Sequence, residues 1–199
     1  IPIKYWEVMN EPDLSGPEEE EGHERLDFYK QDAKAYQELL IKTSEAIRGA
    51  DPEAKILIAG AAGGNDRFLN FYREVFENEN VISAFDIANV HCISNDNYQS
   101  FNVELYKEML QEFGINKPIW VTEAEAIISD DIDINATQVL QSTKKALELG
   151  AEKIFFTRYD FRGRFGGMKP PMPGGEPQDI KPEIDGSNPA EAYRKITGQ

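Results

Sequence analysis

Short apolar runs alternate along the chain with longer stretches in which apolar residues recur at helical spacing. The short runs are rich in β-branched and aromatic residues and most are continuously apolar, which is typical of parallel strands buried on both faces. The predicted strands cover residues 3–9, 55–59, 84–91, 118–122 and 153–157, and the predicted helices cover residues 26–48, 67–77, 103–113, 136–149 and 190–196. This order of strands and helices predicts an α/β fold built from βα units.

The pattern ends in a segment rich in proline and glycine. We assign residues 1–165 to one domain, because no linker signal interrupts the βα alternation before that point. Residues 166–199 are predicted to be a Pro/Gly-rich segment followed by a short terminal helix, with the helix packing on the domain.

Two architectures accept continuously apolar parallel strands. A doubly wound nucleotide-binding sheet needs a glycine-rich turn after its first strand, but the turn here reads NEPDLSGPEEEE and contains no G-x-G-x-x-G. A (β/α)8 barrel collects functional side chains at the carboxyl ends of its strands. Polar residues of this chain gather at those ends: Asn10, Glu11, residues 60–65, His91, Thr122, Glu123, Glu125 and residues 158–160. We therefore expect a TIM-type barrel, with about five of its eight βα units in this chain.

The net negative charge of the chain argues against some classes of binding partner. The chain has 36 acidic against 21 basic residues and a formal net charge of −15, which repels phosphate backbones and anionic lipids. No apolar run is long enough to cross a bilayer. We therefore expect neither a nucleic acid nor a membrane as partner. The run of glutamates at 18–21 and His23 beside it predict a solvated loop.

Two carboxylates follow directly on apolar strands. Glu11 and Glu123 each have a small polar neighbour before them, so they could face one another across a barrel mouth. A pair of carboxylates that flanks a glycosidic bond can cleave it: one protonates the leaving oxygen while the other attacks or activates water. Glu125 is the rival to Glu123, because it lies two residues further on the same nominal strand face. Glu7 is expected to be an ion-paired structural acid.

These motifs resemble a known family. The segments WEVMNEP and IWVTE, in this order and separated by βα units, look like the fourth and seventh strands of clan A glycoside hydrolases, which are (β/α)8 retaining enzymes. The resemblance implies that Glu11 is the acid/base, that Glu123 is the nucleophile and that Asn10 bonds the 2-hydroxyl of the sugar. It also implies an oligo- or polysaccharide substrate with β-linked sugars, and no metal or organic cofactor.

Other family positions differ in this chain. The sixth strand of the clan often reads His-x-Tyr, whereas this chain has His91-Cys92-Ile93, so Tyr98 substitutes for the tyrosine only if its loop folds back. Tyr159 stands where an eighth-strand tryptophan usually supports the sugar. Arg158 beside it could bind an acidic sugar or pair with nearby acids. With these residues, the resemblance implies a substrate-binding set of Asn10, His91, Tyr98, Arg158 and Tyr159.

Strand geometry adds further expectations. Successive side chains of a regular strand point to opposite faces, so the backbone from Met9 to Glu11 must be irregular if Asn10 and Glu11 are to reach one sugar. Trp6 and Trp120 lie within strands and are expected in the core.

Five strands without the first three would leave two open sheet edges, which are prone to aggregation. We therefore expect a second chain, a second copy or an upstream part of a longer product to complete the barrel. Two alternatives stay open: a non-hydrolytic carbohydrate-binding or scaffold half-barrel, and a non-sugar enzyme whose strand-end carboxylates hold a metal. The shortage of histidine at the strand ends argues against the metal enzyme.

Overall fold

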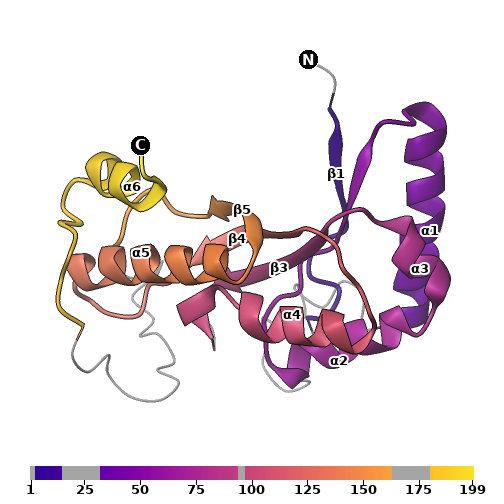
Figure 1. Ribbon diagram of the computed structural model, residues 1–199, viewed down its shortest axis with the longest axis horizontal. Helices are drawn as coiled ribbons and strands as arrows, with labels where there is room; N and C mark the ends of the chain where they lie inside the picture. Colours follow the sequence, from indigo (N-terminus) through magenta and orange to yellow (C-terminus); the bar gives the residue numbers. More distant parts are fainter. Residues whose placement is uncertain (1–2, 15–31, 94–96, 163–179) are drawn as a thin grey trace, which may run out of the picture.

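The computed structural model describes residues 3–14, 32–93, 97–162 and 180–199. Its elements follow one another in the predicted order (Figure 1): β1 (Tyr5–Val8), α1 (Ala33–Ala50), β2 (Lys55–Ile58), α2 (Asp66–Phe76), α3 (Glu79–Ala84), β3 (Ala88–Ile93), a 3-10 turn (Tyr98–Ser100), α4 (Val103–Glu112), β4 (Ile119–Glu125), α5 (Ile132–Glu148), β5 (Ala151–Phe156) and α6 (Pro189–Thr197). The βα alternation is confirmed, and α3 is a helix that the sequence pattern missed. The predicted loop at 18–21, His23 and most of the Pro/Gly-rich segment lie outside the described residues.

The strands are parallel and form two sheets. β1 pairs with β2, while β3, β4 and β5 pair in that order. Single bridges from Leu57 to Ile87 and from Ala61 to Val90 connect β2 with the stretch that contains β3. The strands therefore follow their sequence order across the structure, as in a barrel wall.

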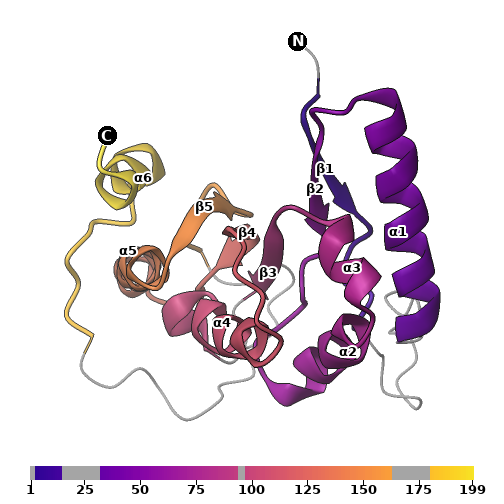
Figure 2. The same cartoon turned by 45° about the vertical axis from the view of Figure 1, so that its right-hand side comes forward.

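Helices α1 to α5 lie along one side of the strands (Figures 1 and 2). Between these helices and the strands lies the main core, an extensive cluster of buried side chains that includes the fully buried rings of Tyr36, Tyr72 and Tyr106. Helix α6 adds Ala192 and Ile196 to the same core. Among the described residues, none of the helices has the length and hydropathy that a membrane crossing needs.

The opposite side of the strands, called here the inner face, is much less filled. Its buried apolar cluster consists of Leu57, Ile87 and Trp120. The ring of Tyr5 lies 4.9 Å from that of Trp120, and the ring of Phe155 lies 5.9 Å from it. Tyr5 and Phe155 are nevertheless about half exposed, at 49% and 47%. The inner face of a (β/α)8 barrel is normally a packed interior, so this side is incompletely covered.

Two expectations about the strands are corrected here. Burial on both faces is wrong for β1 and β5, whose side chains are largely exposed or half-buried, because each strand has a neighbour on one side only among the described residues. Core placement is confirmed for Trp120 but wrong for Trp6, which is 40% exposed on β1.

Lys117 ties α3 to the start of β4. Its ammonium group donates hydrogen bonds to the carbonyl oxygens of Ile82 and Phe85 and lies 4.1 Å above the centre of the Phe85 ring. Burial lowers the pKa of this amine. The lysine satisfies carbonyl groups at the end of a short helix that has no further turn to bond them.

We expect Lys117→Met to lower the free energy of unfolding by about 1–3 kcal/mol, because it keeps the apolar stem but leaves two carbonyl groups without their donor. Equilibrium urea denaturation measures the change. The exposed Lys144→Met on α5 is the control and should stay close to wild type. Equal stability of the two variants would contradict the role of Lys117.

Asp13 joins the loop after β1 to the loop after β2. Its side chain is fully buried, and Oδ2 accepts a hydrogen bond of 2.9 Å from the backbone N–H of Ala62. Burial is the largest influence on its pKa and raises it to about 8, although the backbone N–H groups of Ala62 and of Asp13 itself act in the opposite direction. The carboxyl group is therefore largely protonated at neutral pH.

Because the folded pKa of Asp13 lies above its unfolded value, the stability that it contributes is fully present below about pH 4 and is lost as the pH rises through 8. We expect Asp13→Asn, which cannot ionise, to gain thermal stability relative to wild type as the pH rises from about 4 to 8. Thermal unfolding across this range tests it, with exposed Asp130→Asn as control. A difference in Tm that stays constant with pH would count against it.

Candidate active site

Three side chains that the sequence singled out lie together toward the carboxyl ends of β1, β3 and β4. Nδ1 of His91 is 2.8 Å from Oε1 of Glu11 and 3.9 Å from Oε1 of Glu123. One oxygen of each glutamate and a ring nitrogen of His91 all lie within 4.8 Å of one another. The topology thus places the two predicted acids around one histidine, because carboxyl ends of parallel strands meet at one edge.

Irregular backbone positions the first acid. β1 ends at Val8, and both Met9 and Glu11 have positive φ, at 77° and 43°. The carbonyl oxygen of Glu11 then accepts a hydrogen bond of 3.1 Å from the N–H of Leu14, which closes a tight turn. Positive φ is uncommon for residues other than glycine and collects at functional sites. The predicted irregularity from Met9 to Glu11 is confirmed.

A β-bulge positions the second acid. In the ladder between β3 and β4, Val90 pairs with Val121 but His91 pairs with Glu123, so Thr122 is skipped. Bulges re-aim side chains next to functional sites. Here the extra residue allows both Thr122 and Glu123 to reach the same histidine, at 2.8 Å and 3.9 Å.

His91 is fully buried, and carboxylates surround it. Besides Glu11 and Glu123, Oε1 of Glu7 lies 3.6 Å from Nε2 and also accepts a hydrogen bond from the N–H of Gly60. Burial acts to lower the pKa of His91, but the hydrogen bonds to Glu11 and Glu7 and the charge of Glu123 outweigh it and raise the pKa to about 9. The ring is therefore an imidazolium at neutral pH, and both of its N–H groups donate. Glu7 serves this ring as a structural acid.

A chain of buried and half-buried polar groups fixes the ring. Nε2–H donates to Oγ1 of Thr122, whose hydroxyl donates at 3.0 Å to Oδ1 of Asn89. The side-chain amide of Asn102 donates to the carbonyl oxygen of His91 at 2.7 Å. A Cβ atom at Gly60 would lie only 2.1 Å from Nε2 of the ring. The glycine is thus required for the close approach of the imidazole.

The two acids differ in their surroundings. The side chain of Glu11 is 15% exposed and that of Glu123 is 38% exposed. Burial raises the pKa of Glu123 above its usual value, although the positive charge of His91 acts in the opposite direction. Without the imidazolium, this carboxyl group would be harder to ionise.

Other predicted residues lie around this cluster. Asn10 is exposed beside Glu11. Arg158 has ion-pair contacts to Glu125 at 3.8 Å and to Asp160 at 3.7 Å, while Tyr159 is 73% exposed after β5. Glu125, the rival acid, is therefore held by an arginine rather than by His91. Tyr98 is half-buried and packs against the main core.

Sequence reasoning did not find the roles of Asn89, Thr122 and Asp13. Asn89 is a lone polar residue inside an apolar strand, which was the available signal for a buried hydrogen-bond partner. Thr122 was visible only as the small neighbour of Glu123. Asp13 directly follows the Asn-Glu-Pro motif, and nothing in its local pattern indicates that it turns inward.

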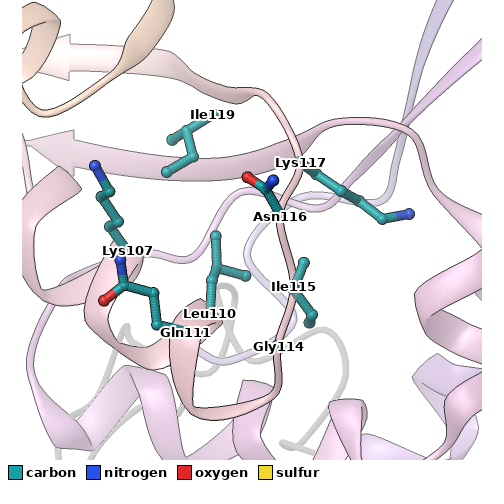
Figure 3. Close-up of a pocket in the computed structure, with 8 residues that line it drawn as sticks. All are labelled: Lys107, Leu110, Gln111, Gly114, Ile115, Asn116, Lys117 and Ile119. Carbon is teal, nitrogen blue, oxygen red and sulfur yellow. The ribbon is translucent and has the colours of Figure 1, made fainter.

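A cavity of about 290 Å³ lies at the opposite, amino end of β4. It is lined by Lys107, Leu110, Gln111, Gly114, Ile115, Asn116, Lys117 and Ile119 (Figure 3). The amine of Lys107 donates to the carbonyl oxygen of Leu149 and that of Lys117 is engaged by α3, so both cations are already bound within the fold. None of the predicted site residues lines this cavity.

Comparisons with known proteins agree with the architecture. The sequence matches no protein-family model and no curated protein. The structure is similar to an endo-β-1,4-mannanase from Thermotoga petrophila, with a TM-score of 0.58 and 15% identity over 98% of this chain and 43% of that one. It is also similar to a glucosidase from Croceicoccus marinus, with a TM-score of 0.54 and 12% identity over 77% of this chain and 32% of that one.

This chain therefore spans less than half the length of either solved structure. At such low identity the likeness bears on the fold alone, and both neighbours have TIM-barrel folds. The chain thus has an α/β fold that corresponds to part of a (β/α)8 barrel.

Proposed function

We propose that the chain carries the active site of a retaining glycoside hydrolase that acts on β-linked sugars of an oligo- or polysaccharide, with Glu123 as nucleophile and Glu11 as acid/base. The observation that carries the proposal is the convergence of both acids on His91 at the strand ends. The remaining residues named from the family resemblance, Asn10, Tyr98, Arg158 and Tyr159, belong to the same proposal as substrate contacts.

The separation of the acids supports retention. Retaining enzymes hold their two carboxyl groups about 5–5.5 Å apart, whereas inverting enzymes leave about 6.5–9.5 Å for a water molecule. An oxygen of Glu11 and an oxygen of Glu123 lie within 4.8 Å of one another, which is on the short side. A direct attack by Glu123 is therefore favoured over activation of water.

The reaction has two steps in this proposal. Glu123 attacks the anomeric carbon as the bond to the leaving oxygen breaks, and Glu11 gives that oxygen a proton. Glu11 then takes a proton from water, whose oxygen displaces Glu123 from the sugar. Glu11 receives the proton that it passes on from the imidazolium of His91, whose Nδ1 lies 2.8 Å from Oε1 of Glu11, and returns a proton to it after taking one from water. Before this transfer, the positive charge of His91 favours ionised Glu123.

Glu123→Gln is expected to abolish turnover of aryl β-glycosides, and Glu11→Gln to slow it by about 10²–10⁴-fold, because the variants lose the nucleophile and the proton donor. Glu125→Gln is the matched control, since this acid contacts Arg158 instead, and should keep most of the activity. Initial rates over a panel of glycosides, with the product anomer followed by proton NMR, give the comparison.

If wild type and both variants are equally inert while sugars still bind, the hydrolase proposal fails. That outcome favours a non-hydrolytic carbohydrate-binding half-barrel. The observation behind this second candidate is that the chain corresponds to only 43% of the mannanase structure.

A completing partner is part of the proposal. Within the described residues, β1 pairs only with β2 and β5 only with β4, and aromatic side chains stand half exposed on the inner face. Such edges and faces attract further strands. We expect a second chain, or a second copy of this one, to cover them.

Sedimentation equilibrium should give a mass above the 22.5 kDa of one chain that rises with concentration. Tyr5→Ser with Phe155→Ser is expected to lower the association, because these exposed rings belong to the inner face. The exposed Leu147→Ser on α5 serves as the control. A soluble chain that stays monomeric at every concentration would overturn this part of the proposal.

A further inference from the structure

The cluster around His91 also has the composition of a metal site. It offers one imidazole nitrogen and two carboxylate oxygens within 4.8 Å of one another. Zinc binds such ligands at about 2.0–2.2 Å, which keeps neighbouring ligand atoms about 3.3 Å apart in a tetrahedral site. The distances from Nδ1 of His91 to Glu11 and Glu123, 2.8 Å and 3.9 Å, lie on either side of that value. Small side-chain movements would therefore suffice.

The hydrogen bonds behind the imidazole are an independent observation in favour of a ligand. A metal-bound histidine almost always donates its other ring N–H to an acceptor, which fixes the tautomer and the orientation of the ring. Here Nε2–H donates to Thr122, and Thr122 donates to Asn89, which is itself fully buried. Nδ1 is thus held toward the two glutamates whether it carries a proton or a metal ion.

The donor set selects the kind of ion. Calcium takes six to eight oxygen ligands and magnesium keeps several waters in an octahedron. A site with one imidazole and two carboxylates suits zinc and similar transition metals. Glu123 is 38% exposed, so water can reach the cluster and fill a fourth position.

We propose that Glu11, His91 and Glu123 bind a divalent ion of the zinc class, and that the bound ion blocks the active site. The blocking part rests on the hydrolase function proposed above, because the ion would occupy both the acid/base and the nucleophile. The ion takes the place of the Nδ1 proton, which leaves to solvent, and no electron is transferred. Metal supply would then regulate the site reversibly.

Isothermal titration of the chelator-stripped chain with zinc chloride tests the binding. Wild type is expected to take up one ion per chain at this site. His91→Asn and Glu123→Gln should each weaken it at least tenfold, because each removes a ligand. Thr122→Val, which removes the support of the ring without touching a ligand, should weaken it by about 10–100-fold.

Two controls separate this site from others. The chain has one further histidine, His23, near the glutamates at 18–21, so His23→Asn should leave the measured affinity unchanged. Glu125→Gln should also leave it unchanged, because Arg158 already contacts this acid. Circular dichroism checks that each variant is folded; Glu123→Gln alters a partly exposed side chain and keeps the test valid if His91→Asn does not fold.

The outcomes distinguish the two proposals. If the chain hydrolyses glycosides but binds no zinc, or binds it equally well after His91→Asn and Glu123→Gln, the metal site is refuted and the hydrolase stands. If zinc binds as expected but no glycoside is cleaved with or without chelator, the metal site stands and the hydrolase fails. Hydrolysis that zinc suppresses and a chelator restores, in wild type and in His23→Asn alike, supports both.

Discussion

The structure depends on one buried positive charge. His91 is fully buried among the carboxylates of Glu7 in β1, Glu11 in the turn after β1 and Glu123 in β4. An unpaired charge in such a place costs several kcal/mol, so the imidazolium and its acids stabilise one another only while these strand ends stay together. The charged groups of the site therefore also stabilise the arrangement of the strand ends that carry them.

Unusual backbone collects around this charge. Positive φ at Met9 and Glu11, the bulge at His91 and the close approach of Gly60 all serve to bring polar groups to one ring. Each of these features disfavours regular strand structure on its own. Their concentration within one cluster indicates that polar contacts to His91, rather than regular strand packing, determine the backbone at this point.

The hydrophobic pattern predicted the five strands, and the parallel topology then placed Glu11 and Glu123 at the same end of the fold. The irregular turn after β1 was also predictable, since Asn10 and Glu11 could not otherwise share a face. The exposure of β1 could not be predicted. Whether an apolar strand is covered depends on neighbouring elements, and the sequence of the strand itself does not describe them. Asn89 and Thr122 were hidden for another reason: a hydrogen bond between strands depends on register, and a bulge shifts register by one residue.

Strand alternation explains how a precise site can exist on an incompletely covered sheet. In β3, Val90 and Cys92 point into the main core, while Asn89 and His91 point to the opposite side. The helices therefore fix the backbone of the strands from the core side. The hydrogen bonds that run from Asn89 through Thr122 to His91 then fix the position of Glu11. Glu11 is held by hydrogen bonds anchored in the finished core and Glu123 by the backbone of β4, so neither position requires the inner face to be filled. Protein packed on the inner face would instead determine which molecules reach the two acids, because its side chains would line the space around them.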